Sequence, residues 1–305
     1  NHPKASILTY YALHSLQHRG QEAAGMTTFA WHEDEQKYKY HYNRGEGLVL
    51  DVFSEPKILT EVLIGDKAIG HNRYSTTGAS KRANIQPFTM RYHSGILSIA
   101  HNGNLTNTKE LWQKLQRKGA IFQTTSDTEL FLHLIARSEK ETTIERIREA
   151  LRTSDGAYSL VILKENALIA ARDPHGVRPL SIGKIKTGNG DAYIVASETC
   201  AFDIINAEYI RSVEHNEIVV IDDETVKTGK IKSYSILDKK PKAKHCIFEY
   251  IYFSRPDSKI FGHNVDKVRR KLGKNLALET PIKTDKDNRI TTVAVPDSGN
   301  TATLG

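Results

Sequence analysis

Residues 95–107 read GILSIAHNGNLTN, an apolar run that ends abruptly in small polar residues. The Asn102-Gly103 pair within it is the strongest short signal for a two-residue β-hairpin turn. A hairpin needs a second alternating strand, but residues 104–112, NLTNTKELW, lead into a helical pattern instead. A turn that ends a strand here would leave a backbone N–H and an amide side chain facing a cleft, as an oxyanion hole requires. The stretch by itself leaves both interpretations open.

The segments around this stretch predict a helix, then sheet, then helices, then sheet again. Short runs rich in β-branched and aromatic residues alternate with turns between residues 27 and 104, as in strands. Apolar residues at helical spacing follow, and a second group of strands comes after Gly156. This order predicts an α+β fold of layered, largely antiparallel sheets. The expected helices are 8–18, 107–118, 127–138 and 142–154, and the expected strands include 37–43, 47–53, 95–102, 157–165, 167–173, 179–184 and 192–197.

Composition narrows the classes of protein to which the chain can belong. It has 305 residues, 39% of them hydrophobic and 26% charged, with a net charge of +7. No apolar run approaches the ~18–20 residues of a membrane span, and no secretory signal pattern opens the chain. The two cysteines fit a reducing cytoplasm rather than a disulfide scaffold. Without an aromatic-interleaved basic stripe, nucleic acid is not an expected partner, and no metal site is predicted from a motif.

The composition changes at residues 237–245, LDKKPKAKH, which are lysine-rich and contain Pro241. We expect a linker there, with one domain over 1–238 and the first part of another over 239–305. A helix is predicted around 264–279. The chain then ends in an apolar strand that leads into Asp297, Ser298, Gly299, Asn300 and Thr301. This loop resembles a phosphate-binding turn after a strand, although it lacks the Walker pattern.

Two charged residues have both an ordinary and a functional interpretation. Asp127 can simply begin a helix, with Ser126 and Glu129 as a capping box, or it can bind an ammonium group. Arg73, among hydroxyl residues, can be a surface arginine or a bidentate clamp on a carboxylate. Together with Asn102 and Gly103, these residues provide what is needed to hold a free α-amino acid while its side-chain carbonyl is attacked. The set lacks only a nucleophile.

Seven motifs in this order resemble the glutamine phosphoribosylpyrophosphate amidotransferase (amidophosphoribosyltransferase) family, and the resemblance covers the whole chain. The motifs are LHSLQHRGQEAAG (13–25), GHNRYSTTG (70–78), AHNGNLTN (100–107), FQTTSDTE (122–129), DPHGVRPLSIG (173–183), VASETCAFD (195–203) and EYIYFSRPDS (249–258). The resemblance implies a four-layer αββα N-terminal-nucleophile glutaminase domain, followed by the start of an α/β phosphoribosyltransferase domain. It implies glutamine hydrolysis and transfer of the ammonia to phosphoribosylpyrophosphate, giving phosphoribosylamine for purine synthesis.

The resemblance also implies roles for individual residues. Arg73 and Thr76 would hold the glutamine α-carboxylate, and Asp127 would hold its α-amino group. Asn102 and Gly103 would form the oxyanion hole. The loop Asp297–Thr301 would bind pyrophosphate. The family's nucleophile is an N-terminal cysteine whose α-amino group acts as base, with a pKa near ~8.

The sequence departs from the family at both ends. At the far end, the family's main phosphoribosylpyrophosphate motif and its flexible closing loop are absent. The chain starts at Asn1, and by the family's spacing the nucleophilic cysteine falls about seven residues upstream. Cys200 and Cys246 lack an adjacent α-amine and do not replace it. Cys246 stands where some relatives have the first ligand of a 4Fe-4S cluster. The family also implies Mg²⁺ bound with phosphoribosylpyrophosphate, purine nucleotides as feedback ligands, and a homotetramer or homodimer.

Two other functions stay open at this point. One is a glutamine amidotransferase with another acceptor, such as a sugar-phosphate synthase, although the ending VAVPDSGNTA argues against it. The other is a catalytically inactive relative that binds glutamine as a sensor, which rests on the missing cysteine alone.

Overall fold

The computed structural model describes residues 2–74, 82–188, 190–283 and 290–305. Antiparallel strands form one six-stranded sheet, two three-stranded sheets and a small two-stranded one within this part of the chain. The six-stranded sheet has the order β12 (Lys232–Ser235), β11 (Glu217–Asp222), β7 (Ala167–Arg172), β6 (Gly156–Lys164), β5 (Gly95–Leu105), β4 (Phe88–Tyr92). The three-stranded sheets have the orders β2 (Lys37–Glu46), β1 (Ala23–His32), β3 (Lys67–Arg73) and β10 (Glu208–Ser212), β8 (Ser181–Thr187), β9 (Gly190–Ala196).

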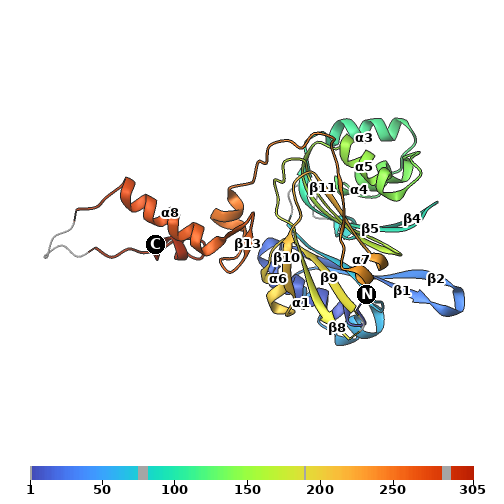
Figure 1. The fold of residues 1–305 in the computed structure, drawn as a ribbon, viewed down its shortest axis with the longest axis horizontal. Coiled ribbons are helices and arrows are strands. Elements are labelled where there is room, and N and C mark those ends of the chain that lie inside the picture. The colour runs from blue at the N-terminus through green and yellow to red at the C-terminus, as the bar shows by residue number, and fades with distance from the viewer. Residues whose placement is uncertain (1, 75–81, 189, 284–289) are drawn as a thin grey trace.

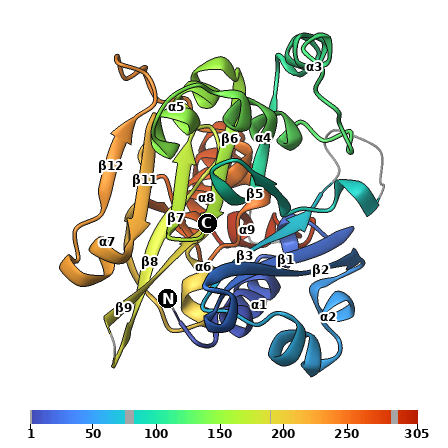
Figure 2. The same ribbon diagram turned by 90° about the vertical axis from the view of Figure 1, so that its right-hand side faces the viewer.

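Four layers enclose the core in the order helix, sheet, sheet, helix (Figure 2). One face of the six-stranded sheet packs on α3 (Thr108–Arg117), α4 (Thr128–Arg137) and α5 (Thr143–Thr153). Its other face packs on both three-stranded sheets. These are covered on the outside by α1 (Ala5–Ser15) and α6 (Cys200–Ile204). The prediction of an α+β fold with stacked antiparallel sheets is therefore confirmed.

Strand β5 lies at the centre of this packing, which explains its continuous apolar run. Leu97 and Ile99 face the helices, whereas Ile96 and Ala100 face β1 and β3. A strand buried on both faces has no polar alternation, because neither face contacts water. The residues that decide the fold thus also fix β5 between the two layers.

The Asn102-Gly103 pair is not a turn, so both the hairpin and the turn at the end of the strand were wrong. Strand β5 continues to Leu105, with Asn102 opposite Ser159 and Gly103 opposite Tyr158 on β6. Gly103 has φ = 152°, and a Cβ there would lie 2.0 Å from the carbonyl oxygen of Ala157. Glycine is needed because any side chain would push β5 away from β6.

The other predicted elements mostly agree with the structure. The helices predicted at 107–118, 127–138 and 142–154 are α3, α4 and α5, and the helix at 8–18 begins earlier, as α1. Residues 47–53 were predicted as a strand but contain the short helix α2 (Val49–Val52); its Leu50 and the preceding Leu48 remain exposed. The helices α6 and α7 (Asp223–Thr228) were not predicted.

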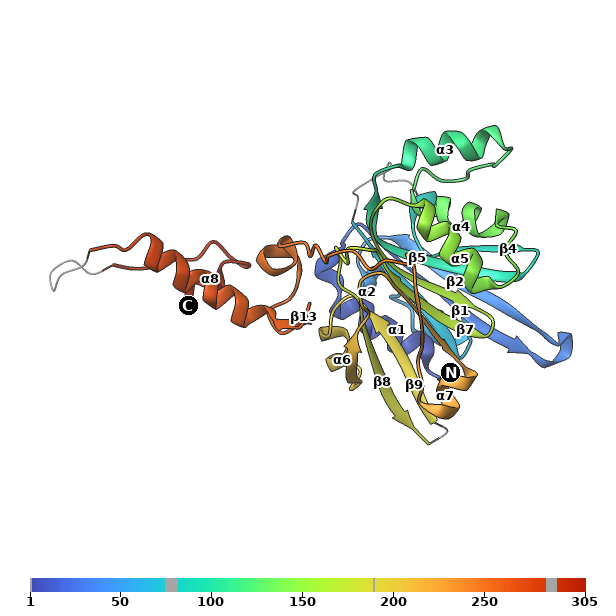
Figure 3. The ribbon, with the colours of Figure 1, turned by 45° about the horizontal axis from the view of Figure 1, so that its top comes forward.

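The C-terminal residues form a separate arm that projects from the layered body (Figures 1 and 3). It contains η5 (Glu249–Phe253), the hairpin β13 (Lys259–Ile260) and β14 (His263–Asn264), α8 (Val265–Glu279) and α9 (Asn300–Thr303). The predicted helix at 264–279 is α8. The predicted strand before the Asp297 loop is absent, since residues 290–295 form no strand.

The segment 237–245 packs more than its composition suggested. The Lys244 N–H donates to the carbonyl of His175, and the imidazole of His215 bonds to the carbonyl of Pro241. These contacts hold the segment against the turn between β7 and β8 and the turn between β10 and β11. No helix in the described ranges is both long and apolar enough to cross a membrane.

Candidate active site

A cleft of about 110 Å³ lies where β3 and β5 end beside the start of α4. It brings together four residues that the sequence singled out, from three distant parts of the chain: Arg73, Asn102, Gly103 and Asp127. Thr76, the fifth, lies outside the described residues. The convergence arises because the layers place the polar end of β5 between Arg73 at the end of β3 and Asp127 before α4.

Backbone donors line one edge of β5 within this cleft. The His101 N–H donates to Gln86 Oε1 at 2.8 Å, and the Leu105 N–H donates to Asp127 Oδ2 at 2.9 Å. By the alternation of a strand, the Gly103 N–H points to the same edge, between these two. On the opposite strand, Tyr158 directs its own N–H and carbonyl toward Asp173. The Gly103 N–H therefore faces the cleft.

Two side-chain donors in the cleft lack partners among the described residues. They are Asn102 Nδ2 and Arg73 Nη2, both shielded from solvent. The other terminal nitrogen of Arg73 donates to the carbonyl of Asn84 at 2.9 Å, which fixes the guanidinium. Buried donors are rarely left unpaired in native structures, so these two indicate a ligand with acceptor oxygens.

Asp127 does not act as a helix cap. Its carboxylate makes no capping hydrogen bond, but accepts from Leu105 on β5 and lies 3.6 Å from His101 Nδ1. Burial alone raises the pKa of Asp127, but hydrogen bonds from His101, Leu105 and Thr128 outweigh it and hold the pKa below its usual value. The cleft therefore keeps a carboxylate that is charged at neutral pH.

The predicted capping box is also not formed. Ser126 Oγ accepts from the Thr128 N–H at 3.3 Å. The carboxylate of Glu129 instead accepts from the N–H groups of Gln123 and Thr124. Glu129 is fully buried and shapes the loop before α4, which leaves Asp127 available to the cleft.

His71 faces the same space from β3. Its Nε2 lies 3.1 Å from the carbonyl of His101, so this nitrogen carries the proton. Burial lowers the pKa of His71 to about 4, although the bond to His101 raises it somewhat. The neutral ring presents Nδ1, which is shielded and has no partner in the described part of the chain.

The sequence did not indicate that Arg19, Arg178 and Phe253 also line the cleft. Arg19 bridges two fully buried carboxylates, Glu198 and Glu249, and Arg178 bonds Glu249 at 3.0 Å. Burial raises the pKa of Glu198, but His18 and Arg19 outweigh it and lower the pKa to about 2. This ion network joins the layered body to η5, whose Phe253 reaches the cleft. The only signal in the sequence was that all three residues lie within motifs that resemble the family.

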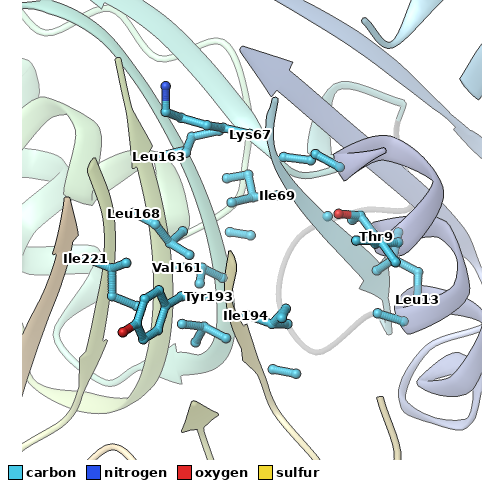
Figure 4. Close-up of a pocket in the computed structure, with 18 of the residues that line it drawn as sticks. Thr9, Leu13, Lys67, Ile69, Val161, Leu163, Leu168, Tyr193, Ile194 and Ile221 are labelled. Atoms are coloured by element: carbon cyan, nitrogen blue, oxygen red, sulfur yellow. The ribbon is translucent and has the colours of Figure 1, made fainter. Parts of the chain in front are cut away.

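A second cavity, of about 230 Å³, adjoins the cleft between the two three-stranded sheets. In the part of the chain that the structure describes, neither β3 nor β9 has a strand paired on the side that faces this cavity. Figure 4 shows apolar side chains around it, including Ile69 from β3, Val161 from β6 and Ile194 from β9. His71, His101 and Asn102 line both cavities, so the two spaces meet at the polar end of β5.

The remaining predicted residues lie elsewhere. Residues 297–299 form a turn in which only Asp297 is exposed, and Asn300 begins α9, on the arm and away from the cleft (Figure 1). Cys246 is half-buried before η5, with its Sγ 3.9 Å from Arg178 Nη1. No group of three or more potential metal ligands gathers within the described ranges.

Comparison with known proteins gives consistent matches. Residues 71–203 match the model of a glutamine amidotransferase domain. The chain is 45% identical over 305 residues to an amidophosphoribosyltransferase of Bacillus subtilis (strain 168), covering 100% of this chain and 59% of that protein. It is 47% identical over 303 residues to a chloroplastic amidophosphoribosyltransferase of Vigna aconitifolia, covering 99% of this chain and 58% of that one.

Two solved structures are similar over the whole chain. One is described as the allosteric regulatory enzyme of purine biosynthesis, with a TM-score of 0.88. The other is the glutamine phosphoribosylpyrophosphate amidotransferase of B. subtilis complexed with ADP and GMP, with a TM-score of 0.86. Each is 44% identical, and the match covers 100% of this chain and 61% of the other. The chain spans about three-fifths of the length of these relatives, and it is similar to amidophosphoribosyltransferases over its whole length.

Proposed function

We propose that the protein containing this chain is an amidophosphoribosyltransferase. It hydrolyses glutamine and uses the ammonia to displace pyrophosphate from phosphoribosylpyrophosphate, giving 5-phosphoribosylamine, the first step of purine synthesis. One observation carries the proposal for this chain. The cleft holds two buried donors without a partner among the described residues, Arg73 Nη2 and Asn102 Nδ2, beside the charged carboxylate of Asp127.

This arrangement fits free glutamine. Arg73, fixed through Asn84, offers its second nitrogen to the α-carboxylate. Asp127 offers its charge to the α-ammonium group. Asn102 Nδ2 and the Gly103 N–H then meet the side-chain carbonyl, where negative charge develops when it is attacked. Thr76 stays a prediction for the carboxylate end.

The nucleophile is proposed to lie on the chain before His2, inside the cavity between β3 and β9. The His2 N–H donates to the carbonyl of Asp66, so the chain enters beside the free edge of β3. If the chain before His2 is extended, it runs antiparallel to β3, and each of its residues lies opposite one residue of β3. The residue about seven places before Asn1 then falls opposite Tyr74, next to Arg73 and at the cleft. A cysteine there reaches the substrate carbonyl.

Glutamine hydrolysis proceeds through a thioester on this cysteine. The thiol gives its proton to the α-amine, and the sulfur bonds to the amide carbon while the oxygen takes the negative charge. The C–N bond breaks, the amine returns the proton to the leaving nitrogen, and ammonia departs. Water then cleaves the thioester, which releases glutamate and restores the thiol.

The second half of the reaction concerns the arm. Residues 297–301 are proposed to bind the pyrophosphate of phosphoribosylpyrophosphate, for which Thr301 Oγ1 is a shielded hydroxyl without a described partner. The same proposal includes Mg²⁺ bound with this substrate and purine nucleotides as feedback ligands. It also includes a homotetrameric or homodimeric state and a cytoplasmic location. A 4Fe-4S cluster with Cys246 as one ligand stays a prediction; such a cluster takes four cysteine ligands, and the other cysteine of this chain, Cys200, is buried beside Ser15.

The experiment uses the full-length protein and follows three products: glutamate, ammonia and pyrophosphate. Glutamine and phosphoribosylpyrophosphate together are expected to yield all of them in step. Replacing the upstream cysteine by alanine should abolish the glutamine-dependent reaction and spare pyrophosphate release driven by added ammonia. Glutamate without pyrophosphate would favour an amidotransferase with another acceptor. No glutamate at all, with glutamine still bound, would favour an inactive sensor.

A further inference from the structure

A short segment, residues 84–86, carries two buried polar side chains beside the cleft, and one of them, Gln86, lines it. It lies between η4 (Arg82–Asn84) and β4, and its Asn84 and Gln86 are 1% and 5% exposed. The carbonyl of Gln86 abuts β1, where a Cβ on Gly25 would lie only 2.2 Å from it. The segment is therefore pressed against the sheet and cannot shift easily.

Asn84 connects the two residues assigned to the ends of the amino acid. Its carbonyl accepts from Arg73 Nη1 at 2.9 Å. Its side-chain Oδ1 accepts from the Thr125 N–H at 2.9 Å, and its Nδ2 donates to Thr125 Oγ1 at 2.8 Å. Thr125 stands two residues before Asp127. Asn84 thus sets the spacing between the guanidinium and the carboxylate.

Gln86 connects the oxyanion strand to α4. Its Oε1 accepts from the His101 N–H at 2.8 Å, one residue before Asn102. Its Nε2 donates to Thr128 Oγ1 at 3.1 Å, and this hydroxyl lies 3.2 Å from His101 Nδ1. The bond to His101 and the bond from Leu105 to Asp127 flank the Gly103 N–H on one strand edge. Gln86 therefore fixes one side of the oxyanion donor pair.

We infer that Asn84 and Gln86 are positioning residues with separate tasks: Asn84 sets the amino-acid clamp, and Gln86 sets the oxyanion hole. The inference rests on the proposed glutamine hydrolysis. Contacts made equally with substrate and transition state affect KM, whereas contacts to developing charge affect kcat. The two residues should therefore affect different kinetic constants.

The test measures glutamate release by the full-length protein at varied glutamine concentration. Asn84→Ala is expected to raise KM about tenfold with kcat within about twofold, because the clamp loosens. Gln86→Ala is expected to lower kcat about tenfold with KM within about twofold, because the Gly103 N–H shifts. Asn84→Asp and Gln86→Glu keep the acceptor oxygens and should recover most of each loss, even where an alanine variant folds poorly.

A matched control removes a similar buried amide far from the cleft. Asn216 bonds the N–H and the carbonyl of Leu237, and its φ of 63° suits glycine, so Asn216→Gly deletes these bonds without backbone strain. It should lower the melting temperature and leave kcat and KM unchanged. Equal changes in kcat and KM for Asn84→Ala and Gln86→Ala, or changes no larger than in the control, would overturn the inference alone. No glutamate release by the unmutated protein would overturn the proposed function with it.

Discussion

Replacing Asp127 by asparagine separates its charge from its structural hydrogen bond. The amide oxygen of asparagine can still accept the Leu105 N–H, which lies 2.9 Å from Oδ2. The charge that faces an α-ammonium group is lost. A hydrogen bond to a charged group contributes about 1.5–3 kcal/mol, so KM for glutamine should rise by a factor of about 10–100. The melting temperature should stay close to that of the unmutated protein.

Replacing Asp127 by alanine adds a structural loss. The buried Leu105 N–H then has no acceptor, which costs about 1–3 kcal/mol of unfolding free energy. The melting temperature should fall by several degrees in addition to the change in KM. Steady-state glutamate release and calorimetry on the full-length protein measure both quantities. An unchanged KM in Asp127→Asn would refute the ammonium role and leave Asp127 as a purely structural tie between α4 and β5.

Three further changes test other parts of the site. Asn102→Ala should lower glutaminase turnover by about 10²–10³ at nearly constant melting temperature, since it removes one oxyanion donor; an unchanged turnover would contradict the oxyanion role. Because the pKa of His71 is lowered to about 4 in the folded protein, the unfolded state alone binds its proton between about pH 6.5 and 4. Unfolding free energy should therefore fall by about 2 kcal/mol from pH 6.5 to 5, and His71→Gln should remove this part of the pH dependence, as measured by denaturant titration at each pH. Glu249→Gln removes a fully buried carboxylate and leaves two half-buried arginines short of a counter-charge, so it should cost about 3–5 kcal/mol of unfolding free energy. Asp238→Asn, which breaks exposed ion pairs, should cost under about 1 kcal/mol, and equal costs would contradict a structural role for the buried network.

The sequence predicted the elements whose local pattern and packing agree. The sequence of α4 has apolar residues at helical spacing, which form the face that packs on the sheet. The sequence of β5 is continuously apolar because both of its faces are buried. Residues 47–53 were misjudged because apolar side chains in a short helix can remain exposed, as Leu50 does. The Asn-Gly pair was misjudged because its glycine is required by the close approach of the Ala157 carbonyl on the neighbouring strand, and not by a turn.

The site was only partly predictable for a related reason. Arg73, Asn102 and Asp127 could be chosen as candidate site residues from their side chains alone, because guanidinium, amide and carboxylate groups bind distinctive partners. Asn84 and Gln86 gave no such signal. Their roles depend on hydrogen bonds to residues 11 to 42 positions away, which exist only after the sheets and α4 have packed.

Strand β5 is both a core strand and the source of the Gly103 N–H donor, and the length of its neighbour β4 connects the two roles. A strand edge normally satisfies its N–H groups with a neighbouring strand, but β4 pairs only as far as Ile99. Beyond that point Gln86 and Asp127 replace the missing neighbour at His101 and Leu105. The N–H of Gly103 between them faces the cleft, held on both sides by side chains that are themselves buried. The shortness of β4 thus turns the end of a core strand into a fixed donor, which a flexible hairpin turn at the same residues would not provide.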